Sequence, residues 1–188
     1  PNLPDFPYDP EKAKLYLAEE GWKDSDGDGI RDKAGKPFEF TFSYPGVGSF
    51  YEPLAGLMRT EFARHGIQMK TEKLEWAVYL EKLRKHDFDS CSLLWGMQPR
   101  NDPYQIWHSS SANGGSNFIQ YANPEVDALL EKARGEFDDA TALPMYHRFS
   151  EILAQQQPYT LLFNRYNLSV ASKKLGGLRS TPFVIFRL

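Results

Sequence analysis

The chain has 188 residues and a formal net charge of −3, with 41% hydrophobic and 25% charged residues. This composition is typical of an ordinary globular domain, and the length is sufficient for one hydrophobic core. The slightly acidic balance excludes the basic surface that nucleic acid or an anionic membrane requires, and no apolar run is long enough to cross a bilayer.

The first half of the chain alternates helical and strand patterns. Asp9 and Pro10 begin a helix that ends at Gly21, with its apolar side formed by Ala13, Leu15 and Leu17, because Asp caps helices and Pro fits the first turn. The following patterns predict a strand over 37–44, a helix over 49–66, a strand over 67–74, a helix over 75–86 and a strand over 87–96.

Two of these segments carry clear burial patterns. Phe38, Phe40 and Phe42 alternate along the first strand, which is the period of a strand with one buried face. In the helix over 75–86, the residues expected to face inward share helical spacing and are Trp76, Tyr79, Leu80 and Leu83.

The second half begins with an irregular region over 96–123, rich in Gly, Ser, Asn and Pro. Long segments of this kind are commonly functional. Helices are predicted over 123–135, capped by Asn123, and over 139–157, and one or two strands over 159–172. The alternation of strands and helices predicts an α/β domain, in which ligands bind at the loops beyond the strand ends.

An aspartate-rich loop precedes the first long strand. Its four acidic residues occupy positions 1, 3, 5 and 9 of a calcium loop and are Asp24, Asp26, Asp28 and Asp32. Position 12, where an EF-hand carries a bidentate Glu, is Gly35. The loop is therefore either a structural calcium clip or a turn whose aspartates bind the backbone. No cofactor is expected beyond this calcium.

No enzyme motif is present. The sequence lacks G-x-S-x-G, a phosphate-binding P-loop and H-E-x-x-H. Cys91 lies in a predicted strand and is expected to be a packed, inert thiol. Ser109–Ser111 beside His108 could in principle form a hydrolase site, but serine runs in loops are typical of solvated turns. The chain is predicted not to be an enzyme.

The order of several segments resembles extracellular solute-binding protein family 5, the peptide and nickel-type receptors of ABC importers. The matching segments are "YDPEKAKLYLAEEGW", "DSDGDGIRDKAGKPFEFTF", "DFDSCSLLWG", "DPYQIWHSS", "GSNFIQYANPEVDALLEKAR" and "YHRFSEILAQQQPYTLLFNRY". The resemblance implies that 1–188 is a single domain, the C-terminal lobe of a larger two-lobed receptor. The implied fold is an α/β lobe of the type II periplasmic-binding-protein kind, with helices packed on a mixed sheet.

The resemblance also implies the partners and the place of action. They are a small solute such as a peptide, the missing N-terminal lobe and an ABC permease with its ATPase, at the periplasmic or extracellular face of the membrane. Closure of the two lobes would enclose the solute. The alternative hypothesis is a stand-alone interaction module clipped by calcium.

Family positions indicate candidate ligand-binding residues in two segments. They are Trp95, Gln98, Arg100 and Asp102 in the first, and Ser116, Asn117 and Tyr121 in the second. The aspartate that binds the α-ammonium in peptide receptors falls near Pro99 or Arg100, so an acidic partner is missing there. Arg100 suits a carboxylate or phosphate, or is a solvated surface residue. Trp95 is assigned to the cleft and Trp107 to the core. The polar residues of the second segment could equally stabilise a turn.

Overall fold

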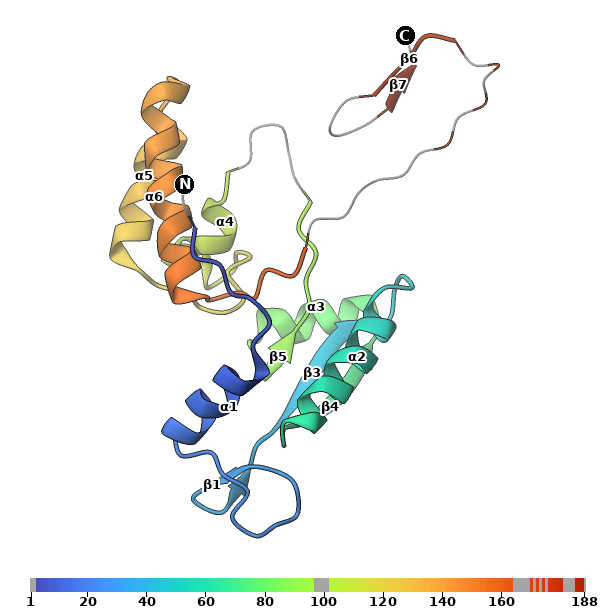
Figure 1. Cartoon of the computed structure of the whole chain (residues 1–188). Coiled ribbons are helices and arrows are strands. Elements are labelled where there is room, and N and C mark those ends of the chain that lie inside the picture. Colours follow the sequence, from blue (N-terminus) through green and yellow to red (C-terminus); the bar gives the residue numbers. More distant parts are fainter. Residues whose placement is uncertain are drawn as a thin grey trace. The chain divides into compact units, whose positions relative to one another are not determined.

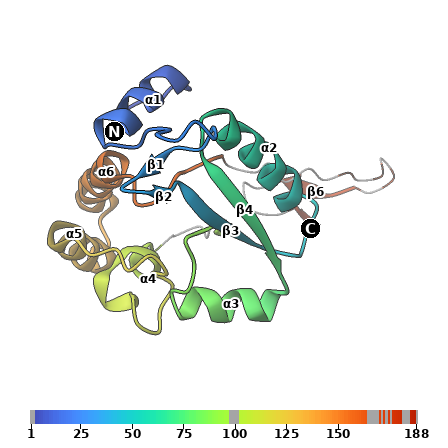
Figure 2. The ribbon, with the colours of Figure 1, turned by 90° about the horizontal axis from the view of Figure 1, so that it is seen from below.

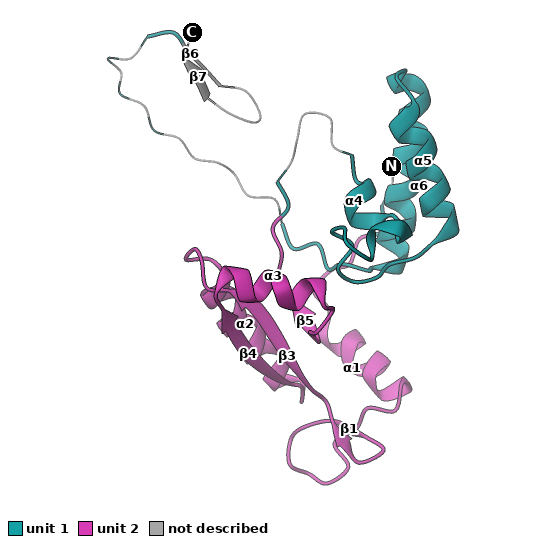
Figure 3. Ribbon diagram, turned by 180° about the vertical axis from the view of Figure 1, so that it is seen from behind, with its two compact units in different colours: residues 1–4, 95–188 teal, residues 5–94 magenta. Residues whose placement is uncertain are grey.

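The computed structural model describes residues 3–96, 102–163, 170, 172, 174, 176–180 and 185–187. The chain forms two compact units, shown in Figure 3: unit 2 is Asp5–Leu94, and unit 1 is Trp95–Leu188 together with Pro1–Pro4. Each unit has its own hydrophobic core. Compact units can be parts of one domain, so the single domain over 1–188 stays a prediction.

Unit 2 is built around a parallel three-stranded sheet of order β4-β3-β5 (Figure 1). The strands are β3 (Glu39–Pro45), β4 (Gln68–Leu74) and the short β5 (Ser90–Cys91). Helix α2 (Tyr51–Arg64) connects β3 to β4, and α3 (Trp76–Arg84) connects β4 to β5. Parallel strands need such crossover helices, so the alternation of patterns along the sequence produces this topology.

The alternation of side chains along β3 separates the two faces of the sheet. Phe42 and Tyr44 are buried with Met69 and Ala55, on the face that α2 covers. Ser43 points to the other face, where α3 packs, and is 1% exposed. In Figure 2 the two helices lie on opposite sides of β3 and β4.

The start of unit 2 is less buried. Helix α1 (Pro10–Glu19) begins as predicted, with the Asp9 carboxylate accepting from the Lys12 backbone N–H at 3.0 Å. None of its residues is buried, and Leu15 is 63% exposed. A small antiparallel hairpin of β1 (Asp32–Lys33) and β2 (Lys36–Pro37) follows the aspartate loop.

Unit 1 is mainly helical in its described part. Its elements are α4 (Tyr104–Trp107), the 3₁₀ helix η1 (Ser109–Ser111), α5 (Pro124–Gly135), α6 (Asp139–Gln156) and the hairpin strands β6 (Leu178–Ser180) and β7 (Ile185–Arg187). Its core consists of Trp107, Val126, Leu130, Phe149 and Ile152, contributed by α4, α5 and α6. The burial of Trp107 confirms its assignment to a core.

Four sequence expectations differ from the structure. The strand over 87–96 is reduced to Ser90–Cys91, which pairs with Phe42 and Ser43, while the Asp89 side chain takes the next backbone N–H of β3 at Thr41. The region over 96–123 contains α4 and η1 and is therefore not irregular throughout. Trp76 is 43% exposed instead of facing inward, because it begins α3 at the end of the sheet. Residues 159–163, 170 and 172 are not in strands, and the remainder of 159–172 lies outside the described residues.

Parallel strands joined by crossover helices confirm the predicted α/β class. In the described residues, antiparallel pairing occurs in the two small hairpins and at the Lys23–Asp32 bridge that closes the aspartate loop. No helix in the described part of the chain has both the length and the hydropathy to cross a membrane.

Candidate functional site

The Trp95 side chain is a partly exposed aromatic ring that packs on a buried one. Its ring stacks on Phe118, with ring centroids 6.3 Å apart and planes at 14°. Phe118 is 8% exposed, whereas Trp95 is 37% exposed. The buried ring holds the indole in place, and the exposed part of the indole can stack on a flat or apolar group.

Asp102 lies at the start of α4 and makes two interactions with its own unit. One carboxylate oxygen accepts from the Tyr104 backbone N–H at 3.0 Å, and the other is 3.0 Å from Arg134 Nη2. Its side chain is 43% exposed. Gln98 and Arg100, the other candidates of this segment, lie outside the described residues.

Asn117 is the most buried of the candidate residues that the structure describes, with an exposure of 0%. Its amide nitrogen donates to the His108 carbonyl at 3.1 Å and to the Tyr121 carbonyl at 2.8 Å, while its oxygen accepts from the Tyr121 N–H at 2.9 Å. The adjacent Ser116 donates its N–H to the Gln105 carbonyl at 3.0 Å. The hydrogen bonds of Asn117 therefore fix the backbone of the segment that carries Ser116 and Tyr121.

Tyr121 joins this segment to the helical core. Its hydroxyl donates to Gln156 Oε1 at 2.5 Å, and its ring meets Trp107 edge to face, with centroids 5.9 Å apart. Burial raises the pKa of the Tyr121 hydroxyl. The phenol is therefore neutral at physiological pH and can only exchange hydrogen bonds with a ligand.

The His108 and serine cluster is arranged as a helix cap. The Ser110 backbone N–H donates to His108 Nδ1 at 3.1 Å, and Ser110 Oγ is 2.8 Å from the same nitrogen. Nε2, on the other side of the ring, lies 3.3 Å from Glu131 Oε1 and 3.9 Å from Asp127 Oδ1. Because a backbone N–H already engages the lone pair of Nδ1, the ring is poorly placed to act as a base for Ser110.

Cys91 shows no sign of nucleophilic activation. Burial raises the pKa of its thiol to about 11, which keeps it protonated at neutral pH. The neighbouring Tyr79 is fully buried and donates its hydroxyl to the Ser92 carbonyl at 2.7 Å. The expectation of a packed, inert thiol agrees with these surroundings.

The aspartate loop brings three carboxylates together. Oxygen atoms of Asp24, Asp26 and Asp28 lie within 4.8 Å of one another and are exposed. Both oxygens of Asp24 also accept backbone N–H groups, from Gly27 at 2.8 Å and Gly29 at 3.0 Å. The loop thus has the donor type that calcium prefers, and its turns are also held without an ion.

Asp32, the fourth candidate calcium ligand, does not belong to this group of three and binds Ser25 instead. Its carboxylate accepts from the Ser25 backbone N–H at 2.9 Å and from the Ser25 hydroxyl at 2.7 Å. These hydrogen bonds lower the pKa of Asp32. Asp32 closes the loop as a hydrogen-bond acceptor in this structure.

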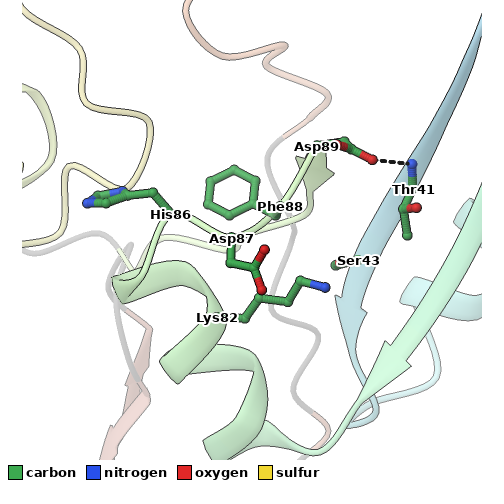
Figure 4. A pocket seen from close by; sticks show the side chains of 7 residues that line it. All are labelled: Thr41, Ser43, Lys82, His86, Asp87, Phe88 and Asp89. Atoms are coloured by element: carbon green, nitrogen blue, oxygen red, sulfur yellow. Dashed lines mark hydrogen bonds between the residues drawn. The ribbon is translucent and has the colours of Figure 1, made fainter.

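A shallow polar cavity of about 320 Å³ lies in unit 2 (Figure 4). It is lined by Thr41, Ser43, Lys82, His86, Asp87, Phe88 and Asp89. The Asp89 carboxylate accepts from the Thr41 N–H at 2.8 Å, where β3 continues past the short β5. Asp89 therefore closes the free end of the sheet edge in place of a paired strand.

Exposed apolar side chains at the end of the sheet were missed by the burial patterns. Val47, Trp76 and Leu94 follow β3, β4 and β5 and are 52%, 43% and 55% exposed. The carboxyl ends of parallel strands meet at one edge, which is the usual ligand-binding edge of open α/β sheets. The positions of these residues directly after strands are the sequence signal that could have identified them.

Comparison with known proteins assigns relatives to this chain. Residues 1–117 match the family model of bacterial extracellular solute-binding proteins, family 5 Middle. The chain is 34% identical over 183 residues to the oligopeptide-binding protein AppA of Bacillus subtilis, covering 96% of this chain and 34% of that protein. It is 31% identical over 173 residues to protein XP55 of Streptomyces lividans, covering 92% and 32%.

The chain also matches solved structures, that of AppA among them, which confirms the predicted α/β lobe of the type II receptor kind. The structure of Bacillus subtilis AppA in complex with a nonapeptide matches with a TM-score of 0.78 and 36% identity, over 84% of this chain and 32% of that one. NikZ from Campylobacter jejuni in complex with Ni(L-His) matches with a TM-score of 0.74 and 28% identity, over 84% and 32%. The chain spans about a third of the length of these relatives.

Proposed function

Because the chain belongs to family 5 of the bacterial extracellular solute-binding proteins, we propose that it is the C-terminal ligand-binding lobe of a two-lobed receptor. The receptor captures a peptide-class solute at the periplasmic or extracellular face of the membrane. It then delivers the solute to an ABC permease with its ATPase. The observation that carries this proposal is the match along 96% of the chain to an oligopeptide-binding protein.

The proposed ligand surface combines the two segments of unit 1 around Trp95. The exposed indole stacks on the solute, and the Ser116 and Tyr121 hydroxyls provide hydrogen bonds. Gln98 contacts the solute, and Arg100 binds a carboxylate or phosphate group on it. Asp102 adds its partly exposed carboxylate to this surface, and the buried Asn117 acts on the surface through its hydrogen bonds with the Tyr121 backbone.

Within unit 2, the exposed apolar residues that follow the strands are a separate candidate surface for a solute. Val47, Trp76 and Leu94 would contact apolar side chains of a peptide. NikZ, whose solved complex holds Ni(L-His), belongs to the same set of relatives, so the choice of a peptide is part of the proposal.

The mechanism requires no bond chemistry. The solute binds one lobe, the second lobe closes on it, and the closed form is recognised by the permease. This chain alone offers one wall and buries only part of the solute, so it should bind far more weakly than the two-lobed receptor. Calorimetry on both forms with the same solute tests this, and equal affinities would contradict the mechanism.

The aspartate loop has at most a structural role in this proposal. A calcium ion held by Asp24, Asp26 and Asp28 would stabilise the loop without contacting the solute. The rival hypothesis, a stand-alone module clipped by calcium, gains no support from the relatives, which are named for the solutes they bind.

The decisive experiment is native mass spectrometry of the two-lobed receptor purified from its own cells. We expect a spread of carried masses that differ by amino-acid residues. A single mass that corresponds to a sugar or a metal chelate would replace the peptide by that solute. Recovery of the receptor without any bound solute, together with no binding of a random nonapeptide pool, would contradict the proposal.

A further inference from the structure

Arg134 lies on α5, outside both segments that we propose to line the solute, yet it contacts the first of them. Its Nη2 is 3.0 Å from the Asp102 carboxylate. Its guanidinium also lies over the Tyr104 ring, with Cζ 4.2 Å from the ring centroid. Arg134 therefore holds the start of α4 by an ion pair and a cation–π contact at the same time.

The contacts continue from Tyr104 to the second segment. The Tyr104 ring stacks on His108, with centroids 4.1 Å apart and planes at 15°. His108 is 7% exposed, and its carbonyl accepts from the buried amide of Asn117 at 3.1 Å. Asn117 in turn fixes the backbone of Tyr121 through two hydrogen bonds. An unbroken series of contacts thus runs from Arg134 to both proposed walls of the site.

We propose that Arg134 is a positioning residue of the ligand site, which sets the solute affinity through Asp102 and Tyr104 without touching the solute. This inference rests on the proposed function, because it assigns those two segments to the solute. Arg134 keeps α4 in the geometry that presents Asp102 at one wall and, through His108 and Asn117, Tyr121 at the other.

The positioning role depends on the planar shape of the Arg134 guanidinium more than on its charge. The Arg134 and Asp102 side chains are 45% and 43% exposed, so solvent screens the ion pair and its charge alone contributes little. A planar guanidinium can cover the Tyr104 ring and reach Asp102 at the same time, whereas the lysine ammonium is a compact point charge. Arg134→Lys therefore keeps the charge and loses the simultaneous contact with both residues.

The chain offers a closely matched control. Arg148 on α6 forms an ion pair with Glu125 on α5, at 2.7 Å, and its side chain is 46% exposed. Its contacts do not reach Tyr104, and we assign it no role in ligand binding. Arg148→Lys thus makes the same chemical change at a similar exposure within the same unit.

The test uses the full-length receptor and a randomised nonapeptide pool as probe, with affinity measured by tryptophan fluorescence. We expect Arg134→Lys to weaken binding by about fivefold to tenfold, because a smaller fraction of the receptor is competent to bind. Arg148→Lys should stay within about twofold of the unchanged receptor, and both variants should keep its melting temperature within about 2 °C. Hydrogen exchange at the amides of Ser116 and Tyr121 should rise in the first variant alone.

Equal affinities and equal exchange rates in the two variants would overturn the positioning role. A loss of affinity accompanied by a large fall in melting temperature would also overturn it, because the effect would then be general destabilisation. If the unchanged receptor does not bind the pool, the proposed peptide function fails separately. The exchange rates at Ser116 and Tyr121 still decide whether Arg134 orders this surface.

Discussion

Replacement of Asn117 by alanine should strongly destabilise unit 1. The side chain is 0% exposed and makes three hydrogen bonds, to the His108 carbonyl and to the carbonyl and N–H of Tyr121. Alanine leaves these backbone groups without their partner in a buried place. At about 1 kcal/mol net for each bond, the free energy of unfolding should fall by about 3 kcal/mol.

Equilibrium urea unfolding, followed by tryptophan fluorescence to which the buried Trp107 of the same unit contributes, measures this loss. Asn113→Ala serves as the matched control, because Asn113 is an exposed asparagine of the same region. It should change the free energy of unfolding by less than about 0.5 kcal/mol. A loss below about 1 kcal/mol for Asn117→Ala would refute the reasoning that this amide organises the segment.

Asn117→Asp adds a pH dependence with a definite sign. The new carboxylate would be buried and would face the His108 and Tyr121 carbonyl oxygens, which raises its pKa in the folded state above the unfolded value. The variant should therefore be closest to the unchanged chain in acid and should lose stability as the pH rises toward 7. A pH-independent difference would contradict this placement of the side chain.

Three further predictions concern unit 2. Hydrogen bonds from Lys82 and Ser43 lower the pKa of Glu72 in the folded chain. The ionised Glu72 therefore stabilises the folded state by about 0.5–1 kcal/mol at a pH above its unfolded-state pKa, and this contribution is lost as the pH falls through its folded-state pKa. In Glu72→Gln, the free energy of unfolding measured with urea should fall less as the pH is lowered. The same fall with pH as in the unchanged chain would contradict the pairing of Glu72 with Lys82. Cys91, with a pKa of about 11, should resist a thiol-specific disulfide reagent at pH 8 until urea unfolds the chain; rapid labelling of the native chain would show an accessible thiolate. EDTA should leave the circular dichroism of the fold intact, because backbone N–H groups already hold the Asp24 turn; collapse on chelation would favour the calcium-clipped module instead.

Local signals in the sequence predicted the helix boundaries well. Asp9 and Asn123 cap α1 and α5, and a proline occupies the first turn of each helix, as predicted. These are interactions between neighbours in the chain, so sequence spacing is sufficient to identify them. The alternating phenylalanines likewise predicted β3, because one face of that strand meets α2.

The parts that failed depend on distant partners. Trp76 has the same helical spacing as Tyr79, but only Tyr79 is buried, and its hydroxyl reaches the Ser92 carbonyl just after β5. Asn117 stands in a glycine- and serine-rich segment that is equally compatible with a solvated turn, and its burial follows from contacts with His108 and Tyr121. Spacing along one sequence does not contain this information. The ligand-binding roles of Trp95, Asp102 and Tyr121 remain predictions, and those of Gln98 and Arg100 lie outside the described residues.

β4 is an outer strand of the described sheet, and the residues it carries affect association of its edge with other chains. An unpaired strand edge can add a strand from another chain, which is a common start of aggregation. β4 carries Lys70 and Lys73 on its two faces, paired with Glu39 at 2.5 Å and Glu52 at 2.9 Å. A strand from another chain would have to desolvate both ion pairs to pair with β4. The charged residues therefore disfavour extension of the sheet at this edge.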